Sequence, residues 1–411
     1  MLRRLLRSPL TASCLLQALL VSGCVHPDPR PTSPPPPARA PLAKDYGREL
    51  APGESALRRS ASWPDLEGAL RDRVALTEQV ERSLNYLGKP SSREFFPKSG
   101  ISHQRCLDSL TAFRDLLVSD LTDREVLDRL RQDFEPWESV GCDGQGTVLF
   151  TGYYTPVFAA SLEQTDVFRY PLHRLPPEHV KDPKTGETKG LRRKDGTLDR
   201  DYPDRQALLA SGRLEGLELC WLSDPFEAYV CQVQGSALLR LRDGSNLEVG
   251  YAGSNGREYR SIGQELIRQG KLRRDELSLQ RLLQYFRDHP EDLDPILSTN
   301  ERYVFFQESS GGPFGCINER VVPLRSIATD KSIFPRAALC FVTAPLPGST
   351  GGGYRGFALD QDAGGAIRAP GRCDVYMGAG EEAGQLAGRT WAEGKLYYLF
   401  LREEPREVSQ R

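Results

Sequence analysis

Short runs of β-branched and aromatic residues, separated by glycine, proline and aspartate, fill most of the chain between residues 147 and 400. The first series of predicted strands covers residues 147–154, 218–229, 236–241 and 247–253, and a second series begins at residues 303–306. Their irregular spacing and the lack of regular alternation with helices argue against a parallel α/β sheet and favour closed or Greek-key barrels. The sequence therefore predicts a mainly β fold with two barrel-like units.

Helical patterns precede the first strands. Apolar residues recur at spacings of three and four over residues 65–86, 104–117 and 123–130, and Thr122 is the predicted N-cap of the third helix. The same periodicity returns at residues 261–268 and 277–287. We expect N-terminal helices beside the barrels and further helices between the two series of strands.

The N-terminus has the layout of a secretory signal peptide, with basic, apolar and small residues in that order over residues 1–23. Its apolar part is shorter than the roughly 20 residues of a membrane-spanning helix, and no later segment is apolar enough to span. Cys24 directly after Val-Ser-Gly resembles the bacterial lipobox, which implies cleavage before Cys24 and lipidation of it. The alternative is an ordinary signal peptide that happens to contain a cysteine.

A proline-rich stretch over residues 27–41 follows the cysteine. Such a segment can neither pair as a strand nor continue a helix, so residues 24–44 are predicted to be an extended tether between the lipid and the folded part of the chain. Val25 is not the aspartate that retains lipoproteins in the inner membrane of enterobacteria, and we therefore expect the outer membrane, facing the periplasm.

The charge of the chain argues against a nucleic-acid partner. Removing residues 1–23 takes away three arginines and no acid, so the formal net charge falls from −2 to −5. No basic stripe or arginine-rich helix compensates for it. The charge therefore excludes more than it suggests, and the membrane is an expected partner only through the lipid anchor.

The residue spacings that are typical of metal sites and of nucleophilic active sites are missing from the sequence. The seven cysteines after Cys24 include no C-x-x-C pair, and an H-E-x-x-H or G-x-S-x-G motif is missing. Cys220 and Cys231 are the first candidates for a disulfide, because they bracket an apolar, strand-like run. With only five histidines in the chain, we predict carboxylate chemistry without a metal or cofactor.

The densest group of acids lies near the C-terminus. Asp360 and Asp362 precede two glycines, Gly364 and Gly365, and Asp374 follows in the next strand-like run. Glycines let a backbone approach a ligand closely, although aspartate and glycine are also the usual residues of turns. Taken alone, this segment leaves an active site and an ordinary turn equally open.

Several runs in one order resemble the membrane-bound lytic murein transglycosylase A family, whose C-terminal part is a three-aspartate domain. The matching runs are residues 151–156, 221–225, 232–236, 249–256, 259–263, 303–306, 322–330 and 362–380. The resemblance implies that Asp330, Asp362 and Asp374 are the three aspartates, with Asp374 catalytic. We assign Asp362 to shaping the site and favouring protonated Asp374, and Asp330 to a more structural role; binding of backbone N–H groups at barrel turns is the competing interpretation for both. Departures from the family pattern are Ala237, Ala363 and Ala369, none of which removes a carboxylate.

The same resemblance implies the fold and the reaction. It predicts a double-psi β-barrel formed by residues 301–411, with helices and first strands from residues 45–156, and a smaller β domain inserted at residues 157–300. Peptidoglycan glycan would lie in the groove between the two domains. The family cleaves the bond between MurNAc and GlcNAc with one aspartic acid and leaves a 1,6-anhydro end. To donate a proton at neutral pH, Asp374 needs a pKa above the usual value of about 3.9.

Sugars bind to aromatic faces and hydrogen-bonding groups, which gives a set of predicted glycan contacts. The set consists of Tyr153, Tyr154, Thr155, Tyr259, Gly364 and Gly365. Core packing is the competing interpretation for each tyrosine, and Trp221, Phe305 and Phe306 are predicted to lie in the core.

Three other classes of function remain open at this point. A hydrolytic glycosidase would use Asp362 or Asp360 as a second carboxylate. An aspartic-protease-like dyad is suggested by Asp362-Ala-Gly364, but it lacks the usual Ser or Thr after the aspartate. A lipoprotein that binds the cell wall without catalysis would need none of these acids. The sequence does not identify other cell-wall enzymes that recruit this one.

Overall fold

The computed structural model describes residues 44–403 except 184–185, 274–275 and 348–353. The described residues belong to one compact unit. The predicted signal peptide, the lipidation site Cys24 and most of the proline-rich tether lie outside the described residues. Within the described part of the chain, no helix is long and apolar enough to cross a membrane.

Three helices precede the main strands: α1 (Arg73–Leu87), α2 (His103–Val118) and α3 (Asp123–Asp133). Thr122 caps α3 as predicted, in a capping box in which its hydroxyl and the Glu125 carboxylate each accept from the other residue's backbone N–H. The first helix is shorter than predicted, because residues 67–72 form turns and α1 begins after the Asp72 cap. A short 3₁₀ helix, η1 (Pro90–Phe95), separates α1 from α2.

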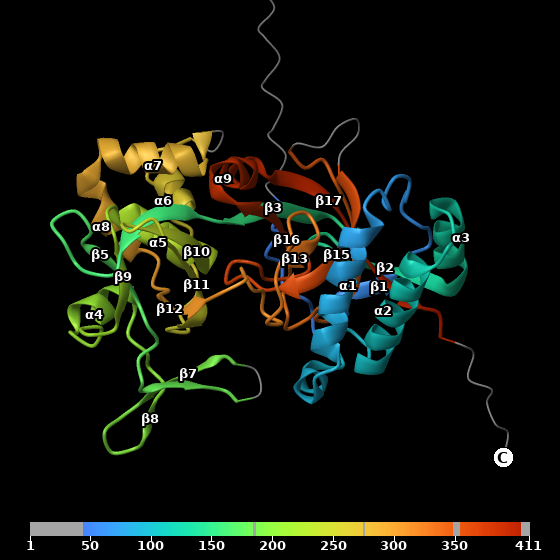
Figure 1. Cartoon of the computed structure of the whole chain (residues 1–411), viewed down its shortest axis with the longest axis horizontal. Helices are drawn as coiled ribbons and strands as arrows, with labels where there is room; N and C mark the ends of the chain where they lie inside the picture. The colour runs from blue at the N-terminus through green and yellow to red at the C-terminus, as the bar shows by residue number, and fades with distance from the viewer. Residues whose placement is uncertain (1–43, 184–185, 274–275, 348–353, 404–411) are drawn as a thin grey trace, which may run out of the picture. The chain divides into compact units, whose positions relative to one another are not determined.

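The larger sheet closes on itself (Figure 1). Its strands are β1 (Leu57–Arg59), β2 (Phe134–Ser139), β3 (Val148–Thr155), β13 (Ser326–Ala328), β14 (Leu339–Ala344), β15 (Tyr354–Asp362), β16 (Arg372–Ala379) and β17 (Trp391–Leu401), in the order β1-β2-β17-β14-β15-β13-β16-β3. An additional pairing of β17 with β3 completes a barrel. The 11-residue β17 makes this possible, because residues 391–394 pair with β3 and residues 397–401 pair with β2.

Helices cover the outside of this barrel (Figure 1). Phe113 of α2 packs on Phe357 of β15 with ring centroids 4.9 Å apart, within one core of buried residues that α1, α2 and the barrel strands share. A further helix, α9 (Gly380–Arg389), packs on β3 and β16. Gly152 faces α9 so closely that a Cβ atom there would lie 2.8 Å from the Ala387 Cα atom. The neighbours Thr151 and Tyr153 therefore point to the opposite side of β3.

A second sheet has six strands in the order β12-β11-β10-β4-β9-β5. Their bounds are β4 (Val157–Ser161), β5 (Tyr170–His173), β9 (Glu218–Leu222), β10 (Ser236–Leu241), β11 (Asn246–Ser254) and β12 (Val304–Ser309). An isolated bridge between Arg174 and Phe306 joins the two edges of the sheet. β12 pairs with β11 and so belongs to this second sheet. The prediction that residues 303–306 begin the strands of the C-terminal barrel is therefore wrong.

The prediction of one strand over residues 218–229 is wrong in its second half. After β9 the chain turns at Asp224, whose carboxylate accepts from the Phe226 and Glu227 N–H groups, and α5 (Pro225–Gln234) follows. Gly235 ends this helix in the left-handed conformation. Cys220 therefore lies on a strand and Cys231 on a helix; both are buried and free, so the suggested disulfide is absent.

Smaller elements complete the described fold. A three-stranded sheet consists of β6 (His179–Lys181), β7 (Thr188–Arg192) and β8 (Leu198–Asp199). The remaining helices are α4 (Arg205–Ala210), α6 (Ile262–Arg268), α7 (Leu279–Asp288), η3 (Pro290–Asp292) and α8 (Leu293–Ser298). Phe305 and Phe306 are buried as predicted, whereas Trp221 is only half-buried.

Candidate active site

Strand register brings the two aspartates of the C-terminal segment onto one row of the barrel. Ala328 of β13 pairs with Asp362 on one side and with Asp374 on the other. Asp374 in turn pairs with Thr151 of β3. Residues directly opposite each other across neighbouring strands point to the same face of a sheet. Asp362 and Asp374 therefore share a face, with a small alanine between them.

A register shift in β15 separates Asp362 from Asp360. Asp360 pairs with Ile327, and the next residue of β13, Ala328, pairs with Asp362, so Gln361 is an extra residue. Such a bulge re-aims the side chains that follow it. The Asp360 carboxylate is fully buried and accepts from Lys331, from the Thr329 hydroxyl at 2.7 Å and from the Tyr398 hydroxyl at 2.7 Å. Asp360 is therefore an internal ion-pair partner and no second catalytic carboxylate.

Asp374 is half-buried, and its Oδ1 atom is buried without a hydrogen-bond partner among the described residues. Burial raises the pKa of Asp374 to about 6, with a further increase from the charge of Asp362. Arg372 and Thr151 act in the opposite direction and lower it. A carboxyl group with this pKa is partly protonated near neutral pH and can both give and accept a proton. The predicted rise in the pKa of Asp374 is thus present.

Arg372 lies two residues before Asp374 on β16, so both side chains point to the same side of the strand. Its Nη2 atom donates a long hydrogen bond of 3.4 Å to the Thr151 hydroxyl. The buried Nε atom has no partner in the part of the chain that the structure describes. Arg372 was not among the predicted site residues, although its two-residue spacing from Asp374 in a strand-like run was a usable signal.

The Asp362 carboxylate is held by three donors. Its Oδ2 atom accepts from the Tyr153 hydroxyl at 2.8 Å, and its Oδ1 atom accepts from the N–H groups of Cys316 at 3.0 Å and Ala363 at 2.8 Å. Burial raises the pKa of Asp362, while these hydrogen bonds oppose the shift. The Tyr153 ring packs on Tyr376 with centroids 5.2 Å apart. Asp362 is therefore fixed in place by its surroundings.

Asp330 joins two loops of the barrel rather than facing Asp374. It is 6 % exposed, and its Oδ1 atom accepts from the Ser332 N–H at 3.0 Å and hydroxyl at 2.6 Å. Its Oδ2 atom accepts from the Ala369 N–H at 2.9 Å. Ala369 has a φ of +70°, a left-handed conformation that favours glycine. These contacts support a structural role for Asp330, which holds the strained loop before β16.

The predicted sugar contacts divide between surface and core. Tyr153 and Tyr259 are half-buried. Burial raises the pKa of Tyr259, Ser261 and Arg372 oppose this rise, and the charge of Asp374 adds to it, so Tyr259 lies close enough to Arg372 and Asp374 to interact with their charges. Tyr154, in contrast, is 6 % exposed within the barrel core, because it follows Tyr153 on a strand and points to the α9 side. Tyr154 therefore packs in the core, as the competing interpretation predicted, and is not a glycan contact.

Thr155, Gly364 and Gly365 also have defined surroundings. Thr155 is buried, and its hydroxyl lies 3.0 Å from the Tyr376 hydroxyl. It therefore stabilises the site from the interior of the protein and does not form part of its surface. Gly364 and Gly365 are half-buried in the loop after Asp362. A Cβ atom on Gly365 would lie 3.1 Å from the Arg302 Nε atom, so a glycine lets the Arg302 guanidinium approach this loop.

One exposed aromatic residue near the row was not predicted. Trp391, the first residue of β17, pairs with Thr151 and is 55 % exposed. Since Thr151 also pairs with Asp374, the row runs from Asp362 to Trp391 across five strands. An exposed tryptophan face is a suitable surface for a sugar ring.

Acidic and imidazole groups of the described residues come together at one further place. His289, Glu291 and Asp292 have ligand atoms within 4.8 Å of one another. Asp292 is already bound by Lys271 at 2.5 Å and by the Tyr285 hydroxyl, and His289 and Glu291 are exposed. This cluster is accounted for by its own ion pairs and plays no part in the row of Asp374.

Comparison with known proteins places the chain in a family. It is 32 % identical over 272 residues to the membrane-bound lytic murein transglycosylase A of Escherichia coli K12, a match that covers 64 % of this chain and 69 % of the relative. The chain belongs to the membrane-bound lytic murein transglycosylase A family. The relative from Vibrio cholerae is 31 % identical over 275 residues, with 65 % of this chain and 69 % of the relative covered.

Family models and solved structures agree with this membership. Residues 149–307 match the MltA specific insert domain, and residues 325–400 match the 3D domain, which contains all three aspartates. A membrane-bound lytic murein transglycosylase from Agrobacterium tumefaciens has a TM-score of 0.71 at 28 % identity, covering 84 % of this chain and 98 % of that one. The E. coli protein with bound chitohexaose has a TM-score of 0.67 at 25 % identity, covering 88 % and 97 %.

Proposed function

We propose that this member of the family is a lytic transglycosylase that cleaves the β-1,4 bond between MurNAc and GlcNAc in peptidoglycan and leaves 1,6-anhydro-MurNAc ends. Asp374 is its acid and base. The observation that carries this proposal is the half-buried Asp374 carboxyl group, whose pKa of about 6 suits a group that must alternate between its two protonation states.

The reaction needs one carboxyl group and no water. Protonated Asp374 donates its proton to the glycosidic oxygen while the bond from that oxygen to C1 of MurNAc breaks. The Asp374 carboxylate then accepts the proton of the MurNAc C6 hydroxyl as O6 forms its bond to C1. Asp374 ends protonated, ready for another cycle. Because the nucleophile belongs to the same sugar, part of the entropic cost of bringing reactants together is avoided.

Asp362 and Arg372 adjust the proton affinity of Asp374. The negative charge of Asp362 favours protonated Asp374 before cleavage, and the positive charge of Arg372 favours its carboxylate afterwards. Tyr153 and two backbone N–H groups hold Asp362 in position. We assign Asp330 to the structure of the loop at Ala369.

Glycan would bind along the row of Asp374. Tyr153, Tyr259, Gly364 and Gly365, with Trp391 added from the structure, are the proposed contacts. We further propose that the barrel is a double-psi barrel and that residues 157–309, which include β12, form the inserted domain. The glycan strand would lie in a groove between the barrel and the inserted domain. The E. coli relative with bound chitohexaose supports a glycan ligand.

The hydrolytic and protease-like alternatives are less well supported. A hydrolase needs a second carboxylate that is free to activate water or attack the sugar. The Asp360 carboxylate is buried and bound by Lys331, and both oxygens of Asp362 already accept hydrogen bonds. Asp362 and Asp374 lie two strands apart, too far for a proton-sharing dyad. Mass spectrometry of digested peptidoglycan tests this: we expect 1,6-anhydro ends, and reducing MurNAc ends one water heavier would identify a hydrolase.

We also propose lipid attachment at Cys24 and location at the outer membrane, facing the periplasm. The relatives' description as membrane-bound supports attachment to a membrane. Cys24→Ala should prevent acylation, and either leave the precursor uncleaved or release a soluble form that still cleaves peptidoglycan. Fractionation tests this, and unmodified Cys24 in soluble wild-type protein would contradict the anchor alone.

A further inference from the structure

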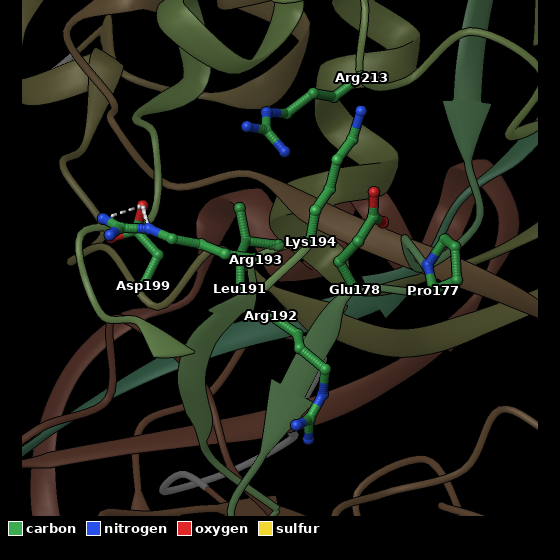
Figure 2. A pocket seen from close by; sticks show the side chains of 8 residues that line it. All are labelled: Pro177, Glu178, Leu191, Arg192, Arg193, Lys194, Asp199 and Arg213. Atoms are coloured by element: carbon green, nitrogen blue, oxygen red, sulfur yellow. Dashed lines mark hydrogen bonds and ion pairs between the residues drawn. The ribbon is translucent and has the colours of Figure 1, made fainter. Parts of the chain in front are cut away.

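A cavity of about 530 Å³ lies beside β7 (Figure 2), and none of its lining residues belongs to the row of Asp374. It is lined by Pro177, Glu178, Leu191, Arg192, Arg193, Lys194, Asp199 and Arg213. Arg193 forms an ion pair with Asp199 at 3.1 Å. Arg192, Lys194 and Arg213 are exposed and have no ion pair or side-chain hydrogen bond with described residues. The cavity therefore has excess positive charge, although the chain as a whole has a net charge of −2.

β7 ends at Arg192, directly before Arg193 and Lys194, and has a fixed position. Leu191 is buried in a cluster with Tyr202, Ala252 and Phe305, which ties β7 to β11 and β12. At the other end of β7, the Thr188 hydroxyl donates to the Ser254 carbonyl at 2.7 Å. The backbone that carries Arg192, Arg193 and Lys194 is thus held by the six-stranded sheet, and less ordering is needed when a ligand binds.

A second, smaller cavity links β7 to the proposed active site. It has a volume of about 150 Å³ and is lined by Thr188, Lys189, Gly190, Arg200, Tyr202, Asn255, Gly256 and Arg257. The Arg257 carbonyl accepts from Arg302 at 3.0 Å, and Arg302 lies against Gly365 of the loop after Asp362. Tyr259 follows two residues after Arg257. β7 therefore borders both cavities, and the smaller one is connected through Arg257 and Arg302 to the loop after Asp362.

We propose that the cavity beside β7 binds the peptide stems of the glycan strand that Asp374 cleaves, an inference that rests on the proposed function. Peptide stems carry carboxylates and a free amino group. Arg192, Lys194 and Arg213 suit the carboxylates, because guanidinium and ammonium groups donate charge-assisted hydrogen bonds to them. In Figure 2, Glu178 lies near Lys194 and provides a carboxylate for the amino group. A mixed cavity of this kind suits a peptide better than a polyphosphate or a lipid headgroup.

The test compares two forms of one substrate. The full chain and its variant R192Q/K194Q/R213Q are given glycan strands with intact peptide stems, and the same strands after an amidase has removed the stems. Release of 1,6-anhydro ends is measured. For strands with stems, the variant should show a KM raised by roughly three- to thirtyfold, from three lost exposed ion pairs, at unchanged kcat. For strands without stems, its kinetics should match those of the wild-type chain.

A matched control removes the same charge elsewhere. R71Q/R240Q/R242Q replaces three exposed arginines outside both cavities and should leave both substrates unaffected. Equal rises in KM for both substrates, or no rise for strands with stems, would overturn the inference. Loss of binding to phosphatidylglycerol vesicles at unchanged KM would also overturn it and identify a lipid surface instead. If the wild-type chain released no anhydro ends from either substrate, the proposed function itself would fail.

Discussion

Asp362 and Asp374 point to the same face of the barrel, each paired with Ala328 on the strand between them. With strands about 4.8 Å apart, their Cα atoms are about 10 Å apart. At this separation the charge of Asp362 raises the pKa of Asp374, and no hydrogen bond joins the two carboxyl groups of the described structure. In the proposed mechanism the two aspartates therefore have different tasks: Asp374 transfers protons, and the charge of Asp362 raises the pKa of Asp374.

Asp362→Asn should lower the pKa of Asp374. The asparagine oxygen can still accept from the Cys316 and Ala363 N–H groups, so the fold should survive. Without the negative charge, Asp374 loses its proton at lower pH, and the alkaline limb of the rate profile should move to lower pH. At neutral pH the rate should fall about tenfold, which corresponds to about 1.4 kcal/mol. An unchanged limb in the kcat profile would contradict this role.

Arg372→Gln should have the opposite effect on the pH profile. Arg372 lowers the pKa of Asp374, so a neutral side chain should let Asp374 keep its proton to higher pH. The alkaline limb should move to higher pH. Because Asp362→Asn and Arg372→Gln are expected to shift the same limb in opposite directions, measuring both separates electrostatic effects from general damage to the site. Shifts in one common direction would contradict the account.

How far the sequence predicts this site depends on the residue. Adjacent residues of a strand point to opposite faces, so the strand prediction for residues 147–154 already implies that Tyr153 and Tyr154 lie on opposite faces. Arg372 could have been found in the same way. The bulge at Gln361, which separates Asp360 from Asp362, depends on pairing with β13 and has no local signal.

Some features of the fold could likewise be predicted from the sequence, and others could not. The N-cap at Thr122 was predicted, because a cap depends on residues within one turn; the capping box with Glu125, three positions on, has an equally local signal. The start of α5 had an equally local signal in Asp224-Pro225 and a stop signal in Gly235, but the apolar run over residues 218–229 obscured both. The pairing of β12 with β11 joins segments about 50 residues apart, and the periodicity of neither strand specifies its partner.

Asp330→Ala should destabilise the fold. It leaves the Ser332 and Ala369 N–H groups and the Ser332 hydroxyl without their acceptor, in a place where Asp330 is 6 % exposed. Such losses cost about 2–4 kcal/mol in total. Urea unfolding measures this, with Ser332→Ala as a control that removes a single hydroxyl and should cost about 1 kcal/mol. Unchanged stability with lost activity would instead assign Asp330 to the chemistry.

Asp374→Asn should stabilise the folded protein at pH 8 and have little effect at pH 4. The folded pKa of Asp374, about 6, lies above its unfolded value of 3.8, so stability from this group is complete below pH 3.8 and is lost as pH rises through 6. Asparagine avoids the cost of a half-buried charge, about 1–2 kcal/mol after allowing for solvent screening. Thermal unfolding of both proteins at the two pH values provides the comparison. Equal effects at both pH values would mean that Asp374 is not held at a raised pKa.

The most direct test of the account is release of anhydro-muropeptides by purified Asp374→Asn. The amide has the same shape as the carboxyl group but neither gives nor accepts the required proton. We predict a loss of roughly hundredfold to ten-thousandfold, with the fold and binding to insoluble peptidoglycan retained. Asp362→Asn, measured beside it, should keep clearly detectable release. Near-normal release by folded Asp374→Asn would contradict the assignment of Asp374 as the acid and base.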